Sequence, residues 1–196
     1  MLEFRLLGTR WTCSLLFPAM VVVLLTLDTG GMALWCLAAS AMHEMGHFAA
    51  LLLCGGRPAL IAVGIFGVRV EQDRHAPLGY GKNLVVSLAG PAVNALSCLL
   101  LLLCGAADTA PFMVHGTMAM MNLLPVEPLD GGQALFCALA PHMDEPKAER
   151  IVLAVSVLTI LPLAAAGFYV LLRSGYNISL LAVCGYLILL LLCKRK

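Results

Sequence analysis

Six long apolar runs dominate this sequence, and their length limits what the chain can fold into. A transmembrane helix needs about 20 mainly apolar residues. The runs approach or exceed that length, and they cover residues 11–27, 31–54, 84–104, 111–140, 151–172 and 178–193. Only 12% of the residues are charged, whereas soluble domains carry about 25%. The runs therefore predict an all-α polytopic membrane protein with about six transmembrane helices.

The remaining composition excludes other classes of protein. A net charge of +1 leaves no basic face for phosphates, so we expect no nucleic-acid partner. The eight cysteines show no CxxC pair, and we interpret them as small apolar packing residues. We expect the first apolar run to be retained as a span, and no appended soluble domain. The prediction is a single transmembrane domain, residues 1–196, with a catalytic core at about 31–140.

A more polar segment, residues 55–82, separates the second and third apolar runs. Within it, residues 59–70 are rich in Ile, Val and Gly and partly alternate, which predicts a short β-hairpin or ribbon. Unpaired sheet edges cannot face lipid. We therefore expect this ribbon to lie at the membrane interface or to pack into the protein.

The basic residues predict the orientation of the chain, because cytoplasmic loops are enriched in Lys and Arg. With six spans and both termini in the cytoplasm, Arg173 is the one basic residue on the outer side. The other eleven lie on the cytoplasmic side: Arg5, Arg10, Arg57, Arg69, Arg74, Lys82, Lys147, Arg150, Lys194, Arg195 and Lys196.

The second apolar run contains the motif His43-Glu44-Met45-Gly46-His47. Ionisable residues inside a membrane span are costly and suggest function. On a helix, His43 and His47 lie one turn apart on the same face and can bind one metal ion. Glu44 lies beside them and could accept a proton from an attacking water. An HExxH motif in the middle of an otherwise uncharged span is a strong signal for a zinc site.

A catalytic zinc usually has three protein ligands, and the fourth run offers the third ligand in Asp130. Pro125 and Pro128 disfavour a continuous helix, so we expect an extended break at residues 125–129 and helix again after the glycines. Such breaks are tolerated in membranes where they line a cavity. At about 1.5 Å per residue, His43, Asp130 and the start of the third run can reach a common depth.

Three motifs together resemble the site-2 proteases, which are intramembrane zinc metalloproteases. They are HEMGH at 43–47, AGPAVN at 89–94 and NLLPVEPLDGG at 122–132. The resemblance implies a three-helix catalytic core, one zinc bound by His43, His47 and Asp130, and Glu44 as catalytic base. It also implies that Asn94 supports the site or the oxyanion of the transition state.

The small size and six-span layout resemble the bacterial sporulation branch of that family, whose known member activates a sigma-factor precursor. The resemblance implies regulated intramembrane proteolysis of a transmembrane or membrane-associated substrate, in or next to a transmembrane segment. It implies location in a bacterial cell membrane, and it leaves room for an inhibitory membrane partner.

Each signal also has a plainer interpretation. His43 and His47 could be packed core residues, Asp130 could cap the helix that follows it, and Asn94 could form an interhelical hydrogen bond. We expect Glu127 to face a water cavity or the interface. His75 and His142 are expected in loops, and His115 is too far along its helix from Asp130 to bind the same ion.

Two rival functions use the same residues. A zinc-binding membrane protein or transporter should place polar groups at several depths, whereas this sequence concentrates them at one. An inactive scaffold would bind clients without cutting them. For a protease, an unwound substrate strand could be held by β-addition, either to the ribbon at 59–70 or to the backbone at 125–129.

Overall fold

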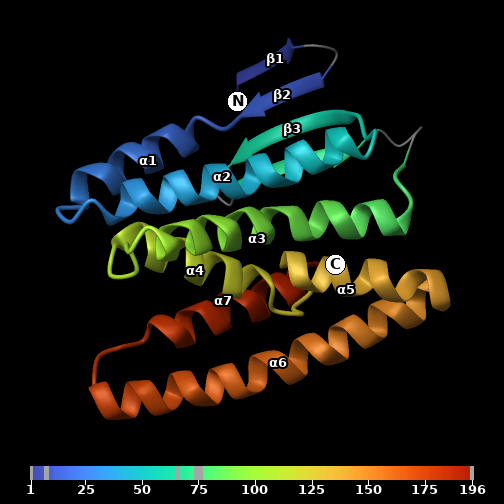
Figure 1. Cartoon of the computed structure of the whole chain (residues 1–196). Helices are drawn as coiled ribbons and strands as arrows, with labels where there is room; N and C mark the ends of the chain where they lie inside the picture. The colour runs from blue at the N-terminus through green and yellow to red at the C-terminus, as the bar shows by residue number, and fades with distance from the viewer. Residues whose placement is uncertain (1, 7–8, 65–66, 73–76, 195–196) are drawn as a thin grey trace. The chain divides into compact units, whose positions relative to one another are not determined.

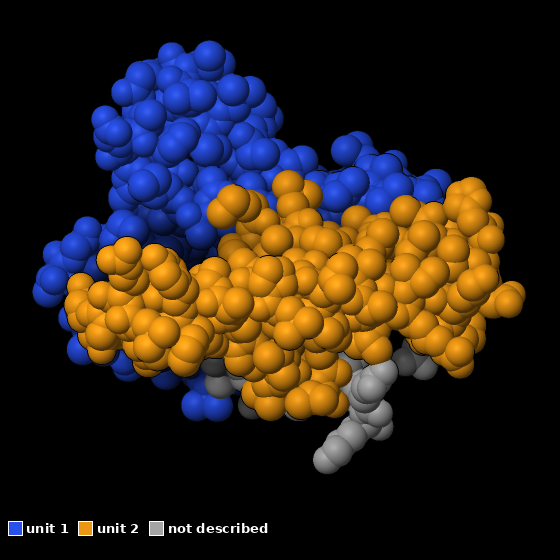
Figure 2. Space-filling view, turned by 90° about the horizontal axis from the view of Figure 1, so that it is seen from below, with its two compact units in different colours: residues 1–119 blue, residues 120–196 orange. Residues whose placement is uncertain are grey.

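The structure is a computed structural model, and it describes residues 2–6, 9–64, 67–72 and 77–194. Arg74, His75, Arg195 and Lys196, named above, lie outside the described residues. By its internal packing, the chain divides into two compact units, residues 1–119 and 120–196. Figure 2 colours the two units separately, and each is described here by itself.

The first unit contains a mixed four-stranded sheet in the order β1-β2-β3-β4. The strands are β1 (Leu2–Leu6), β2 (Thr9–Cys13), β3 (Pro58–Gly64) and β4 (Gly67–Gln72). β1 pairs antiparallel with β2, β2 runs parallel to β3, and β3 pairs antiparallel with β4. The last pair covers the segment in which a ribbon was predicted.

The first two strands correct the prediction for the N-terminal part of the chain. Residues 11–27 were expected to form one helical span, but Thr9–Cys13 is a strand and the helix α1 covers Leu16–Leu27 alone. The five residues of β2, Thr-Arg-Trp-Thr-Cys, are mainly β-branched, aromatic or polar, a composition that suits a paired strand better than a lipid-facing helix. The all-α prediction therefore omitted a sheet that joins the N-terminus to the segment after the HExxH helix.

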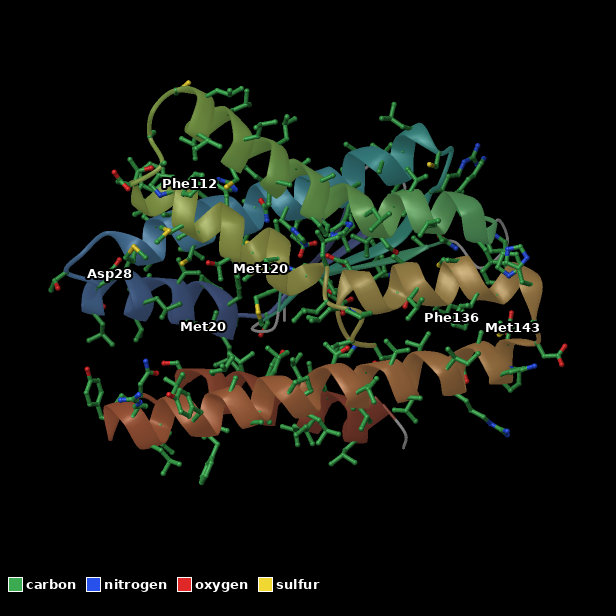
Figure 3. The ribbon with its side chains drawn as sticks, turned by 60° about the horizontal axis from the view of Figure 1, so that its bottom comes forward. Met20, Asp28, Phe112, Met120, Phe136 and Met143 are labelled. Atoms are coloured by element: carbon green, nitrogen blue, oxygen red, sulfur yellow. The ribbon has the colours of Figure 1, made fainter. Side chains whose placement is uncertain are left out.

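Helices α2 (Met32–Leu53) and α3 (Tyr80–Leu103) pack against each other in this unit (Figure 1). Asp28, labelled in Figure 3 in the turn between α1 and α2, accepts hydrogen bonds from the backbone N–H groups of Gly30 and Ala33, at 3.0 and 2.6 Å. These bonds satisfy donors that the first turn of α2 would otherwise expose. The start of the helix predicted at 31–54 is therefore fixed by a side chain of the preceding turn.

The fourth predicted span, residues 111–140, is interrupted as expected. Helix α4 (Ala110–Asn122) ends before the two prolines, and α5 (Asp130–Leu139) begins after them. The prediction that helix resumes after the glycines was wrong by three residues, because α5 begins at Asp130 and contains Gly131 and Gly132. A short 3-10 helix, η1 (Ala140–His142), follows α5.

The second unit also contains α6 (Glu145–Ser174) and α7 (Ser179–Lys194), which pack against each other. Their shared core is apolar, and the extended segment before α5 contributes to it. The buried members of this cluster are Val126, Ile160, Cys184, Leu187 and Leu191. Leu124 and Leu129 pack against the same cluster.

Three helices of the described chain are long and apolar enough to cross a membrane: α2, α3 and α6. In the most apolar window of α3 only 17% of the residues are buried inside the protein. Large apolar side chains such as Leu53, Leu103 and Leu158 are at least 74% exposed. Soluble proteins rarely expose apolar surface on this scale, so these surfaces indicate a membrane protein.

Candidate metal centre

The two histidines of the HExxH motif lie on the same face of α2, as the one-turn spacing predicts. His43 is 4% exposed, and its Nε2 atom lies 3.1 Å from Nε2 of His47. The rings are nearly perpendicular, at 84°, with their centroids 4.7 Å apart. Two ring nitrogens at this distance repel each other unless a proton or a cation lies between their lone pairs. The pair is therefore suited to binding a cation.

Helix α3 orients the ring of His47. The Nδ1 atom of His47 lies 2.7 Å from the carbonyl oxygen of Val86. A carbonyl accepts hydrogen bonds and cannot donate them. Nδ1 of His47 must therefore carry the proton, and the lone pair of the neutral ring is on Nε2, the atom that faces His43.

Asn94, also on α3, orients the ring of His43. Its side-chain amide nitrogen, Nδ2, lies 3.1 Å from His43 Nδ1, and Asn94 is completely buried. The amide therefore contacts the side of the ring opposite Nε2. Outer hydrogen bonds of this kind fix the tautomer and orientation of metal-binding histidines.

Two glycines allow α2 and α3 to approach closely enough for these contacts. A Cβ atom on Gly46 would lie 2.8 Å from the carbonyl oxygen of Ala89 and 2.9 Å from Val93 Cγ2. A Cβ atom on Gly90 would overlap the ring of His47, within 2.7 Å of both Cδ2 and Cε1. Gly90 therefore provides the space for the imidazole. The small residues of HEMGH and AGPAVN thus have a packing role that the ligand pattern alone does not reveal.

A further histidine, His115 on α4, joins this network. It is 7% exposed, and its Nδ1 atom lies 3.0 Å from the second end of the Asn94 amide. The sequence prediction gave His115 no role, because it considered only direct binding to the ion. A buried imidazole in an apolar run was the available signal, since such a group requires a hydrogen-bond partner.

In the second unit, Asp130 is the first residue of α5 and is half-buried. A carboxylate in the first turn is stabilised by the helix dipole. A Cβ on Gly131 would collide with the carbonyl oxygens of Leu123 and Leu124, and one on Gly132 with the backbone of Val126 and Glu127. The two glycines therefore allow α5 to start directly against the extended segment, and this fixes the position of Asp130 within the unit.

Ser156 of α6 holds the extended segment on its other side. Its hydroxyl oxygen accepts a hydrogen bond from the backbone N–H of Glu127 at 2.9 Å. The hydroxyl lies 2.7 Å from the carbonyl oxygen of Val152 and donates to it. Ser156 is completely buried, so this bond satisfies a backbone donor of the kind that a broken helix exposes.

His43 and His47 of the first unit, and Asp130 of the second, are residues that could each offer one ligand atom to a metal ion. Two imidazoles and a carboxylate match the chemistry of catalytic zinc sites. Glu44 follows His43 directly and is half-buried on α2. Among the other predicted positions, Glu127 is half-buried and His142 is exposed in η1.

Comparisons with known proteins agree with this chemistry. The sequence is 29% identical over 146 residues to stage IV sporulation protein FB of Bacillus subtilis, which covers 70% of this chain and 51% of that protein. It is 30% identical over 115 residues to a protein of Synechocystis that is named as a candidate zinc metalloprotease. This match covers 53% of this chain and 30% of that protein. No family model matches the sequence.

The structure resembles that of the site-2 protease from Methanocaldococcus jannaschii. The TM-score is 0.56 at 18% sequence identity, and the match covers 95% of this chain and 91% of that one. The chain therefore resembles a site-2 protease in fold. It spans about half, or less, of the length of the curated relatives it matches. The donor set described above suits zinc.

Proposed function

We propose that this chain is an intramembrane zinc metalloprotease that hydrolyses a peptide bond in or next to a transmembrane segment of a membrane-associated substrate. The observation that carries the proposal is the pair of converging imidazoles, each oriented by a residue of α3. Such an arrangement inside apolar helices is expensive to build and has no packing purpose. His43, His47 and Asp130 would bind one zinc per chain, and the similarity to a protein named as a zinc metalloprotease supports that assignment.

Zinc in this position would supply Lewis-acid chemistry, activating water and polarising the scissile carbonyl. Glu44 would accept a proton from the attacking water and later deliver it to the leaving amine. Val86 and Asn94 would keep both rings in the orientation that binding requires. The buried position of Asn94 behind His43 supports a role in supporting the site, in preference to direct contact with the oxyanion.

The decisive experiment compares the wild type with Glu44→Gln. Each form is co-expressed with candidate single-span and membrane-associated proteins, and the products are analysed by size. We expect a shortened product with the wild type alone, and a rate lower by about 100- to 10,000-fold for the variant. Equal cleavage by both forms would show that Glu44 is not the base.

The same variant tests the rival function. A zinc transporter that uses these ligands should retain part of its flux when Glu44 becomes Gln, whereas a protease should keep zinc and lose cleavage. Transport of zinc into vesicles by both forms, with no cleavage by either, would favour the rival.

We further propose six spans with both termini in the cytoplasm of a bacterial cell, and regulated proteolysis of a signalling protein as the biological role. The similarity to a sporulation protein supports activation of a sigma-factor precursor as one form of that role. We also propose a single transmembrane domain, residues 1–196. Reporter fusions to residues 55–82 and to the C-terminus should both report the cytoplasm.

Strand β4 lies at one edge of the sheet in the described part of the chain, which suits β-addition of an unwound substrate. Gly67 begins β4 and pairs with Gly64. Replacing Gly67 with Pro should reduce substrate turnover while leaving bound zinc intact. If turnover survives, this edge does not hold the substrate.

A further inference from the structure

We infer that His115 is a positioning residue of the metal site: it holds the far end of the Asn94 amide, whose near end orients the ring of His43. The inference deepens the proposed function and rests on it. Three buried side chains from three helices carry it, namely His43 of α2, Asn94 of α3 and His115 of α4. They are joined by contacts of 3.1 and 3.0 Å.

The direction of each hydrogen bond follows from what a metal ligand requires. If Nε2 of neutral His43 uses its lone pair to bind a cation, Nδ1 must carry the proton and donate it. The partner of Nδ1 must then be an acceptor, so a metal-bound His43 requires the carbonyl oxygen of Asn94 to face it. In the structure Asn94 Nδ2 lies toward His43 Nδ1 and Oδ1 toward His115 Nδ1, so metal binding requires the amide to turn over. A half-turn of an amide exchanges its oxygen and nitrogen without altering its shape, so both orientations of Asn94 fit the same space.

With its oxygen toward His43, Asn94 presents its NH₂ group to His115. Nδ1 of His115 must accept this bond, so the neutral ring carries its proton on Nε2. A neutral imidazole presents Nδ1 as an acceptor or as a donor, depending on its tautomer, so His115 can pair with the far end of the amide in both orientations, including the one that metal binding requires. With an apolar residue at position 115, the end of the amide that faces away from His43 would be buried without this partner. Desolvation of an unpaired amide costs about 1–3 kcal/mol.

The test replaces His115 with Leu and with Asn in the full chain. Asn can place a carbonyl oxygen near the position of the His115 Nδ1 atom, and so can restore the bond. We expect His115→Leu to weaken zinc binding by about three- to tenfold, less than the 10- to 100-fold typical of residues that touch a ligand directly. Asn94→Leu should give that larger loss. His115→Asn should recover most of the wild-type affinity, and His142→Leu, at an exposed histidine, should have no effect.

Zinc affinity is measured by competition with a chelator, and the visible spectrum of the cobalt-substituted chain reports the ligand geometry. His115→Leu should change that spectrum, and His115→Asn should preserve it. A wild-type affinity and spectrum in His115→Leu, or equal losses in the Leu and Asn variants, would overturn the inference. A wild-type chain that binds no zinc would instead contradict the proposed function, so the two failures are distinguishable.

Discussion

Two helix pairs of this protein, α2–α3 and α6–α7, are both apolar but pack in different ways. The α2–α3 pair encloses hydrogen-bonded imidazoles and an amide, and its glycines lie against backbone and ring atoms. The α6–α7 pair encloses an apolar cluster that includes Ile160, Cys184 and Leu187. A polar core in a membrane is tolerated where each group has a partner, so the comparison locates the chemistry in the first pair.

The largest effect is expected from adding a methyl group at Gly90, where α3 lies directly against the ring of His47. Gly90→Ala would place Cβ in the ring of His47, so the ring or the helix must move. Overpacking of this kind costs about 1–3 kcal/mol of stability, and we expect zinc affinity to fall with it. Thermal unfolding in detergent and chelator competition measure the two effects. Unchanged zinc affinity in Gly90→Ala would show that the close approach is not needed for the site.

An intermediate effect is expected at Ser156, which holds the extended segment of the second unit. Ser156→Ala would remove the acceptor for the Glu127 N–H, and leaving that donor unpaired costs about 1–3 kcal/mol. Thr159→Val is the matched control, because Thr159 lies nearly one turn away and its hydroxyl donates to the carbonyl oxygen of Val155 in its own helix. Equal unfolding temperatures for the two variants would mean that Ser156 does not stabilise the segment before Asp130.

The smallest effects are expected from glycines of the second pair. A Cβ atom on Gly167 would lie 3.1 Å from the backbone nitrogen of Leu181, and one on Gly185 would meet nothing within 4 Å. We expect Gly167→Ala to cost less than about 1 kcal/mol. Gly185→Ala should be neutral or stabilising by up to about 1 kcal/mol, since Ala favours helix. A loss at Gly185 as large as that at Gly90 would remove the contrast between the two pairs.

The helices that could be predicted from the sequence are those marked by patterns of neighbouring residues, namely apolar runs and prolines. The runs at 31–54 and 84–104 became α2 and α3 with ends displaced by at most four residues, and the break predicted from Pro125 and Pro128 was confirmed. Apolar length and missing backbone donors act within a few residues, so they can be recognised without a structure.

The N-terminal strands could not be predicted in the same way. β2 forms by pairing with β3, which lies about 50 residues later, and no local pattern encodes that pairing. The role of Gly90 as space for a ring depends likewise on two helices meeting. No role was predicted for His115, because it lies too far from Asp130 to bind the same ion. Its contact with the Asn94 amide depends on the packing of two helices. Ligand motifs can be predicted from spacing, but the residues that orient them depend on tertiary contacts.

The metal content of the purified chain tests the central claim most directly. Wild-type protein, reconstituted with zinc in detergent and passed through a desalting column, is analysed for metal alongside His43→Ala, His47→Ala and Asp130→Ala. The proposed site predicts one zinc per wild-type chain and strongly reduced zinc in all three variants. A wild-type chain without zinc, or an Asp130→Ala chain that retains it as tightly as the wild type, would contradict the proposed metal centre.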